Sequence, residues 1–180
     1  ELSGVLAEQV CDPVILYRFC DERNQFKRPM HEKYLFVYAY DNNMNDSEEV
    51  AEILQYAKEN SIKVITAGFY HKWCDRSVNV NPLELLCWIS FAECVITDTF
   101  HGTVMSMVMN TPFATKIRGN RNKLEFLLEE YNCQNREIKD FKELGSLLNT
   151  KMSFDEVNRI MSEKQVQGCA YIQACIDSIG

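Results

Sequence analysis

The sequence lacks several features that would assign it to a specialised class of protein. No hydrophobic run approaches the roughly 20 residues that a membrane-spanning helix requires, and no signal peptide is visible. Acidic residues outnumber basic ones by 26 to 19, and the net charge of −7 argues against a general role in binding nucleic acid. No two of the eight cysteines form a Cys-x-x-Cys pair. The sequence therefore predicts neither a zinc site nor a redox dithiol, and we expect no bound metal.

The cysteines and the first residue bear on where the protein works. Cys87 and Cys94 lie within apolar segments, where a free cysteine behaves as a small hydrophobic side chain. We therefore expect reduced thiols in a cytoplasmic protein rather than disulfides. Because the chain begins with Glu1 and not with methionine, we expect a fragment of a longer protein, although removal of a tag would leave the same start.

Short apolar segments alternate with helical patterns along the whole chain. Strands are expected at 34–40, 62–66, 94–97 and 113–117. Helices are expected after Asp46 and Asn81, over 104–109, from 124, over 140–149 and from about 153 to 178. No hairpin signal joins two strands, so the pattern predicts a parallel sheet covered on both faces. We predict one Rossmann-like, doubly wound α/β domain over 1–180, with 138–180 as a helical extension at its C-terminal end.

Two polar stretches, 21–33 and 69–80, are expected to be loops. The second carries His71, Cys74 and Asp75, a combination that could suggest a metal site. One histidine and one cysteine three positions apart, with no partner pair elsewhere, are a weak signal for a metal. We therefore interpret this stretch as a loop that lines a cleft.

The segment 95–103 is the most informative in the chain. A run of β-branched residues leads into Thr97 and Asp98, then His101, and an apolar helix follows. Such strand-to-helix junctions in α/β proteins place free backbone amides and a positive helix end at the mouth of a cleft. A histidine there can bind anions or transfer protons near neutral pH, and His101 is our candidate catalytic residue. The alternative is a buried histidine that bonds to a backbone carbonyl.

The sequence leaves the roles of the residues next to His101 open. Asp98 and Thr99 both have side chains that can cap the helix, and the sequence does not decide between them. Gly102 lacks a Cβ atom and so favours close approach of a ligand or of a neighbouring strand.

Basic residues follow the last expected strand in a loop at 118–123. Arg118 and Arg121 could hold a carboxylate or a phosphate in the cleft, since a guanidinium group matches both in shape. Lys116 is a weaker candidate. The alternative is a solvated basic loop in front of a helix.

These motifs together resemble the polysaccharide pyruvyl transferase family. The resemblance rests on the string Cys94 to Thr103 (C-V-I-T-D-T-F-H-G-T), the later Asn110-Thr111-Pro112-Phe113, and the early Asp12-Pro13-Val14, and it covers roughly 1–137. It implies the C-terminal, GT-B-like half of a two-domain enzyme. That enzyme transfers a pyruvyl group from phosphoenolpyruvate to two hydroxyls of a sugar in a cell-surface polysaccharide or exopolysaccharide intermediate, and so forms a ketal.

The resemblance also implies roles for particular residues. His101 matches the family histidine that binds or protonates the donor, and Asp98, Thr99, Gly102 and Thr103 are implied to contact substrate. Phosphoenolpyruvate is a co-substrate, so no cofactor is implied. Many members have an arginine where this chain has Thr99, so this chain offers the donor one cation fewer.

Three partners and two rival functions follow from this interpretation. The partners are phosphoenolpyruvate, a glycan or lipid-linked sugar acceptor, and a missing N-terminal domain, without which we expect the chain to be inactive. One rival is a glycosyltransferase-like domain that binds a nucleotide sugar at the same helix end. The other is a domain that only binds a partner.

Overall fold

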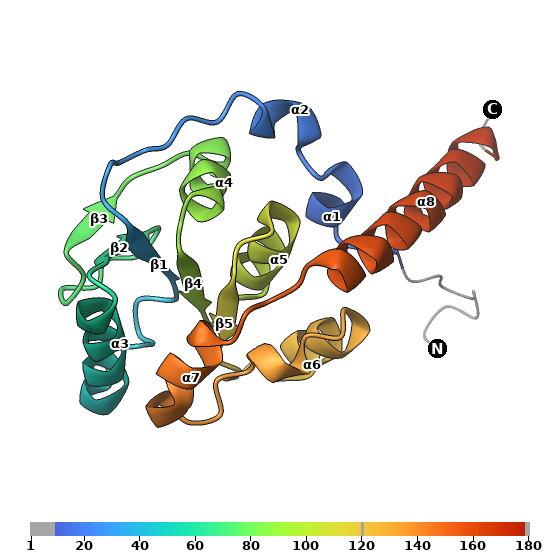
Figure 1. Cartoon of the computed structure of the whole chain (residues 1–180). Helices are drawn as coiled ribbons and strands as arrows, with labels where there is room; N and C mark the ends of the chain where they lie inside the picture. Colours follow the sequence, from blue (N-terminus) through green and yellow to red (C-terminus); the bar gives the residue numbers. More distant parts are fainter. Residues whose placement is uncertain (1–9, 120, 179–180) are drawn as a thin grey trace.

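The computed structural model describes residues 10–119 and 121–178, and its centre is a five-stranded parallel sheet (Figure 1). The strands lie in the order β3-β2-β1-β4-β5, and each neighbouring pair is parallel. Their bounds are β1 Tyr34–Tyr38, β2 Lys63–Ala67, β3 Arg76–Val78, β4 Cys94–Thr97 and β5 Phe113–Thr115. This arrangement confirms the predicted Rossmann-like α/β fold. Because the strands are parallel, all their carboxyl ends meet at one edge of the sheet.

Helices cover both faces of the sheet. Their bounds are α1 Pro13–Tyr17, α2 Cys20–Arg23, α3 Ser47–Glu59, α4 Pro82–Ser90, α5 Phe100–Met109, α6 Arg121–Glu130, α7 Leu144–Asn149 and α8 Asp155–Asp177. Two 3₁₀ turns, Gln134–Arg136 and Phe141–Glu143, precede α7. In Figure 1, α4 and α5 lie on one side of the strands, and α3 and α7 lie on the other.

Alternate strand residues supply two separate cores. Tyr34, Phe36 and Val95 face the core that α1, α4, α5, α6 and the start of α8 complete. Leu35 and Ile96 face the second core, which α3 and α7 complete. Both sets are almost fully buried, which is why these strands are apolar at every position rather than at every second one.

The structure confirms the expected starts of two helices, α3 and α4. Asp46 accepts hydrogen bonds from the amides of Glu48 and Glu49 at the start of α3. Asn81 and Glu84 form a complete capping box at the start of α4. The polar side chains that the pattern singled out therefore satisfy the first free amides of these helices.

Other local predictions were wrong. The stretch 69–80 contains the short edge strand β3, and 21–33 begins within the short helix α2. The expected basic loop 118–123 ends early, because α6 begins at Arg121. The last helix, expected from about 153, begins at Asp155.

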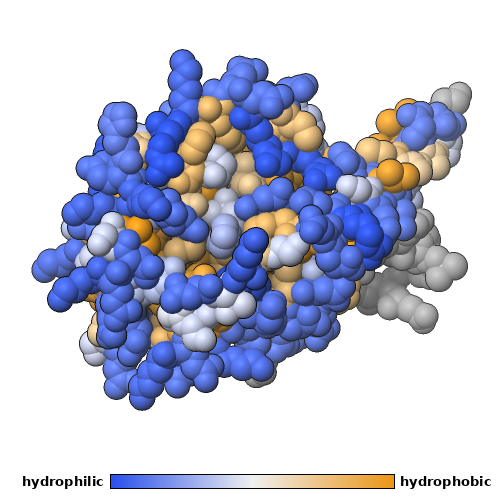
Figure 2. Space-filling model, in the orientation of Figure 1, coloured by the Kyte–Doolittle hydropathy of each residue, from blue (hydrophilic) through white to orange (hydrophobic). Residues whose placement is uncertain are grey.

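The last helix, α8, is only partly packed. Val157, Ile160 and Met161 in its first half belong to the core. Its second half stands away from the sheet in Figure 1, and Figure 2 shows hydrophobic surface at that end of the molecule. Val166 and Ile176 are exposed hydrophobic residues of this helix. No helix among the described residues is both long and apolar enough to cross a bilayer.

Candidate functional site at the carboxyl edge of the sheet

The candidate site is built around the junction between β4 and α5. Thr99 lies between the two elements, and its Oγ1 atom accepts a hydrogen bond of 2.9 Å from the Gly102 amide. Thr99 rather than Asp98 is therefore the cap that the sequence left undecided. The first-turn amides of Phe100 and His101 have no acceptor within the helix. They give the carboxyl edge of the sheet a partial positive charge.

Gly102 allows α5 to approach the end of β4 closely. A Cβ atom at this position would lie 2.2 Å from Oγ1 of Thr97 and 2.7 Å from Oγ1 of Thr99. The absence of a Cβ atom was expected to allow close approach of a ligand or of a neighbouring strand. The structure shows the close approach of a strand, β4. Its predicted role in substrate binding stays a prediction.

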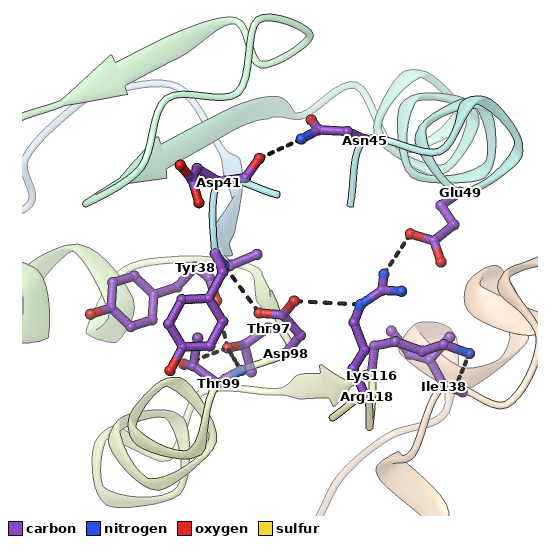
Figure 3. A network of polar contacts seen from close by, with 12 residues as sticks. Tyr38, Asp41, Asn45, Glu49, Thr97, Asp98, Thr99, Lys116, Arg118 and Ile138 are labelled. Atoms are coloured by element: carbon purple, nitrogen blue, oxygen red, sulfur yellow. Dashed lines mark hydrogen bonds and ion pairs between the residues drawn. The ribbon is translucent and has the colours of Figure 1, made fainter. Parts of the chain in front are cut away.

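Threonine hydroxyls beneath the site join β4 to β1 and α5 to β5. The Thr97 hydroxyl donates a hydrogen bond of 2.6 Å to the carbonyl of Tyr38, which joins β4 to β1 (Figure 3). The Thr103 hydroxyl donates to the carbonyl of Thr99 and lies 2.9 Å from the hydroxyl of Thr115 in β5. Thr103 is fully buried, so in this conformation its side chain supports the site from below.

Asp98 is held inside the sheet edge. Its side chain is fully buried, and Oδ1 accepts a hydrogen bond of 3.2 Å from the Tyr40 amide. Oδ2 lies 3.4 Å from Nε of Arg118, an ion pair in which neither atom has a hydrogen-bond partner among the described residues. Burial raises the pKa of this carboxyl above its ordinary value, although the amide and the guanidinium favour the charged form.

Arg118 connects the sheet to α3. Its Nη2 atom lies 2.6 Å from Oε2 of Glu49, and Figure 3 shows the guanidinium between this carboxylate and that of Asp98. Two carboxylates therefore fix the position of Arg118, whose side chain remains partly exposed. Glu49 lies in the first turn of α3, and its side chain reaches across to this arginine.

The raised pKa of Asp98 gives a test by pH. A carboxyl with a raised folded-state pKa binds its proton more tightly in the folded protein. The stability it contributes is present below the unfolded value of about 3.9 and is lost as pH rises through the folded value. We expect Asp98→Asn, which cannot ionise, to gain stability relative to the wild type from about pH 4 upward. Urea unfolding of both proteins across this range measures the difference. A wild type that gains on the variant instead would mean that the ion pair with Arg118 outweighs burial.

His101 is the exposed residue of the junction. Its side chain is 57% exposed on the first turn of α5, and its Nε2 atom lies 3.9 Å from Oδ2 of Asp12. The ring of Phe100 meets the His101 ring edge-on at 5.6 Å between centroids. The structure therefore excludes the alternative of a buried histidine bonded to a carbonyl. An exposed imidazole beside a carboxylate can exchange protons with a ligand at the helix end.

The other basic residues are placed less favourably for binding an anion. Lys116 donates two hydrogen bonds, to the carbonyls of Ile138 and Lys139. Lys123 lies over the ring of Phe100, with Nζ 4.2 Å from the centroid. Arg121 is the first residue of α6, and its side chain lies outside the described part of the structure.

The loop residues His71, Cys74 and Asp75 have structural roles instead of binding a metal together. His71 is buried, with Nδ1 3.3 Å from Oδ1 of Asn45. Asp75 accepts a hydrogen bond of 2.8 Å from the Val64 amide, and burial raises the pKa of the Cys74 thiol to about 12. Across 10–119 and 121–178, no three His, Cys, Asp or Glu side chains form a group that could hold a metal ion.

Comparison with known proteins places this arrangement in a family. The family model for polysaccharide pyruvyl transferase matches residues 1–115, which include the whole β4–α5 junction and His101. The chain belongs to the polysaccharide pyruvyl transferase family. Arg118 and Arg121 lie beyond the matched part. A comparison with curated proteins found no match.

Two solved structures resemble this chain over about half of their own length. One is the UDP-GlcNAc 2-epimerase of Methanocaldococcus jannaschii, with a TM-score of 0.51 and 16% identity over 82% of this chain and 49% of its own. Another is a glycosyltransferase from Streptomyces nogalater, with a TM-score of 0.48 and 9% identity over 94% of this chain and 48% of its own. The chain therefore spans about half the length of these proteins. The first likeness supports the fold.

Proposed function

We propose that this chain is the donor-binding half of a polysaccharide-modifying transferase that moves a pyruvyl group from phosphoenolpyruvate to a sugar. The single observation that carries the proposal is an exposed His101 on the first turn of α5, within the part of the chain that matches the pyruvyl transferase family. Phosphoenolpyruvate carries a carboxylate and a phosphate, which suit the positive end of a helix.

His101 is the proposed general acid. Its imidazolium would give a proton to the terminal carbon of the enol, and the neighbouring carbon would then accept a sugar hydroxyl. The bond from that carbon to the phosphate oxygen breaks, a second hydroxyl closes the ketal, and the two hydroxyl protons are released. The ion pair of Arg118 with the buried Asp98 would keep the helix end in place beside the donor.

The rest of the enzyme belongs to the same proposal. A second domain would face this edge of the sheet and complete the cleft, and we expect this chain alone to bind the donor without turning it over. We place the reaction in the cytoplasm, where the eight cysteines, all free in the structure, would stay reduced.

Calorimetric titration of phosphoenolpyruvate at low salt tests the proposal. We expect weak binding that falls about tenfold or more in His101→Ala, a loss of roughly 1.4 kcal/mol, and that weakens as salt is added. His31→Ala is the matched control, because His31 is also exposed but lies before β1, at the opposite edge of the sheet. It should bind as the wild type does.

A nucleotide sugar is the competing ligand. UDP-GlcNAc is bound in the epimerase structure that shares this fold, so it is titrated alongside. Binding of UDP-GlcNAc without any response to phosphoenolpyruvate would refute pyruvyl transfer and favour a nucleotide-sugar enzyme. Equal affinity of His101→Ala and wild type for phosphoenolpyruvate would remove His101 from the donor site.

A further inference from the structure

A pocket of about 350 Å³ is lined by Phe100, which precedes His101, and by Asp12, whose carboxylate lies 3.9 Å from the His101 ring. Its walls come from the segment before α1, the start of α5 and one face of α6. Pockets that hold small ligands in proteins measure about 300–1,000 Å³, so this one is large enough for a single sugar ring. The lining residues that matter here are Asp12, Phe100, Lys123, Phe126, Glu130 and Tyr131.

The pocket contains a buried hydroxyl without a partner. Tyr131 is fully buried, and among the described residues its Oη atom has no hydrogen-bond partner. Burial, with the negative charges of Glu130 and Asp12 nearby, raises the pKa of this phenol, so the hydroxyl stays protonated and can donate. A buried hydroxyl left without a partner costs about 1–3 kcal/mol, which a ligand that accepts from it would offset.

Asp12 supplies an acceptor between the pocket and His101. Its Oδ1 atom accepts a hydrogen bond of 2.9 Å from the Val14 amide and so caps α1. Its Oδ2 atom lies 3.9 Å from Nε2 of His101, which is too far for a hydrogen bond. Oδ2 can therefore accept from a hydroxyl placed beside the imidazole.

Two aromatic rings and the balance of charge define the ligand class. Phe100 and Phe126 both line the pocket, and Phe126 is 48% exposed. Lys123 is engaged over Phe100, and Glu130 is paired with Lys164 at 2.6 Å. With Asp12 added, the pocket has no excess of positive charge, so it does not suit a ligand with both a carboxylate and a phosphate. It suits a neutral ring that carries hydroxyls on its rim and C–H groups on its face.

We infer that this pocket binds the sugar ring that receives the pyruvyl group. The ring lies against Phe126, one hydroxyl donates to Oδ2 of Asp12, and another accepts from Oη of Tyr131. The hydroxyl on Asp12 then lies next to His101, at the junction of the sugar pocket and the helix end. The inference rests on the proposed function, because it assigns the donor to the helix end and the acceptor to this pocket.

Protein NMR with methyl glycosides of glucose, galactose and mannose tests the inference, each titrated at millimolar concentration into the whole chain. At least one glycoside should shift resonances of Phe126, Tyr131 and Asp12. Tyr131→Phe should weaken that binding roughly 2- to 10-fold, the effect of one neutral hydrogen bond. Phe126→Ala, at an exposed position where the fold is not at risk, should weaken it as well.

Tyr34→Phe is the matched control. Tyr34 is equally buried, but its hydroxyl donates a hydrogen bond of 2.6 Å to the carbonyl of Trp88. We expect a crossed result. Tyr34→Phe should lower the unfolding temperature and leave glycoside binding unchanged. Tyr131→Phe should weaken binding and raise the unfolding temperature, because it removes a buried hydroxyl that has no partner among the described residues. Glycoside binding that Tyr131→Phe and Phe126→Ala both leave intact would overturn the inference, as would the absence of binding by all three glycosides.

The titration with phosphoenolpyruvate separates this failure from that of the proposed function. Donor binding without glycoside binding at the pocket overturns the sugar site and leaves the donor site standing. Glycoside binding that depends on Tyr131 without donor binding supports the sugar site and refutes the proposed donor.

Discussion

Replacing Gly102 by alanine is expected to destabilise the protein strongly, although alanine normally favours a helix by up to about 1 kcal/mol over glycine. The added Cβ would lie 2.2 Å from Oγ1 of Thr97. That oxygen cannot move aside cheaply, because it bonds to the Tyr38 carbonyl and to the amide of Thr99. Overpacking of this kind costs about 1–3 kcal/mol and occasionally more. For a chain of this size, the unfolding temperature falls by roughly 2–4 °C for each kcal/mol, which circular dichroism can measure.

Gly145→Ala is the matched control for this substitution. Gly145 also lies in a helix, α7, but a Cβ there would meet only Cδ2 of Tyr56 at an ordinary distance of 3.9 Å. We expect it to leave stability unchanged or to raise it by up to about 1 kcal/mol. Equal unfolding temperatures for the two variants would show that α5 can shift away from β4. A loss of ligand binding in Gly102→Ala should therefore be interpreted only after its stability is known.

The central elements of the fold could be predicted because their residues are buried on every side. Strand β4 was predicted over 94–97 and begins and ends at those residues. Strand β3, in contrast, was missed because it has three residues at the edge of the sheet, and Arg76 and Ser77 in it are exposed. A strand that buries little apolar surface leaves no periodic pattern for sequence analysis to detect.

Only the part of the candidate site that lies in one short segment could be predicted from the sequence. The sequence places His101 and Thr99 at the junction because both lie in one short segment. The partners of the site come from far along the chain. Glu49 meets Arg118 across 69 positions, and Asp12 meets His101 only because α1 packs beside α5. Local patterns cannot supply such pairs, since the fold creates them.

Arg136 is a residue whose importance only the structure reveals. It follows a polar stretch, yet it is 2% exposed. Its Nε atom donates a hydrogen bond of 2.8 Å to the carbonyl of Phe113 in β5. Its Nη1 atom donates to the carbonyls of Leu147 and Thr150 at the end of α7. A single guanidinium thus joins the edge strand to the carboxyl end of a helix, where a positive charge is also favoured by the helix dipole.

Arg136→Met is expected to destabilise the protein by about 1–3 kcal/mol, because the buried carbonyl of Phe113 is left without a donor. Methionine fills most of the volume and removes a buried charge, a change that is often neutral when both partners of a pair are replaced. Here the carbonyl of Phe113 stays buried without its donor, while the bonds to Leu147 and Thr150 are only partly buried. The loss at Phe113 therefore decides the sign.

Arg159→Met separates the effect of burial from the number of hydrogen bonds. Arg159 also makes three hydrogen bonds, to Glu156 and Glu163, but its side chain is 54% exposed. Water replaces those partners when the guanidinium is removed, so the midpoint of urea unfolding should stay within experimental error. If Arg136→Met were as stable as Arg159→Met, the cost of burying the guanidinium would equal the value of its three bonds. The joint between β5 and α7 would then rest on the apolar contacts of Leu144 and Leu148.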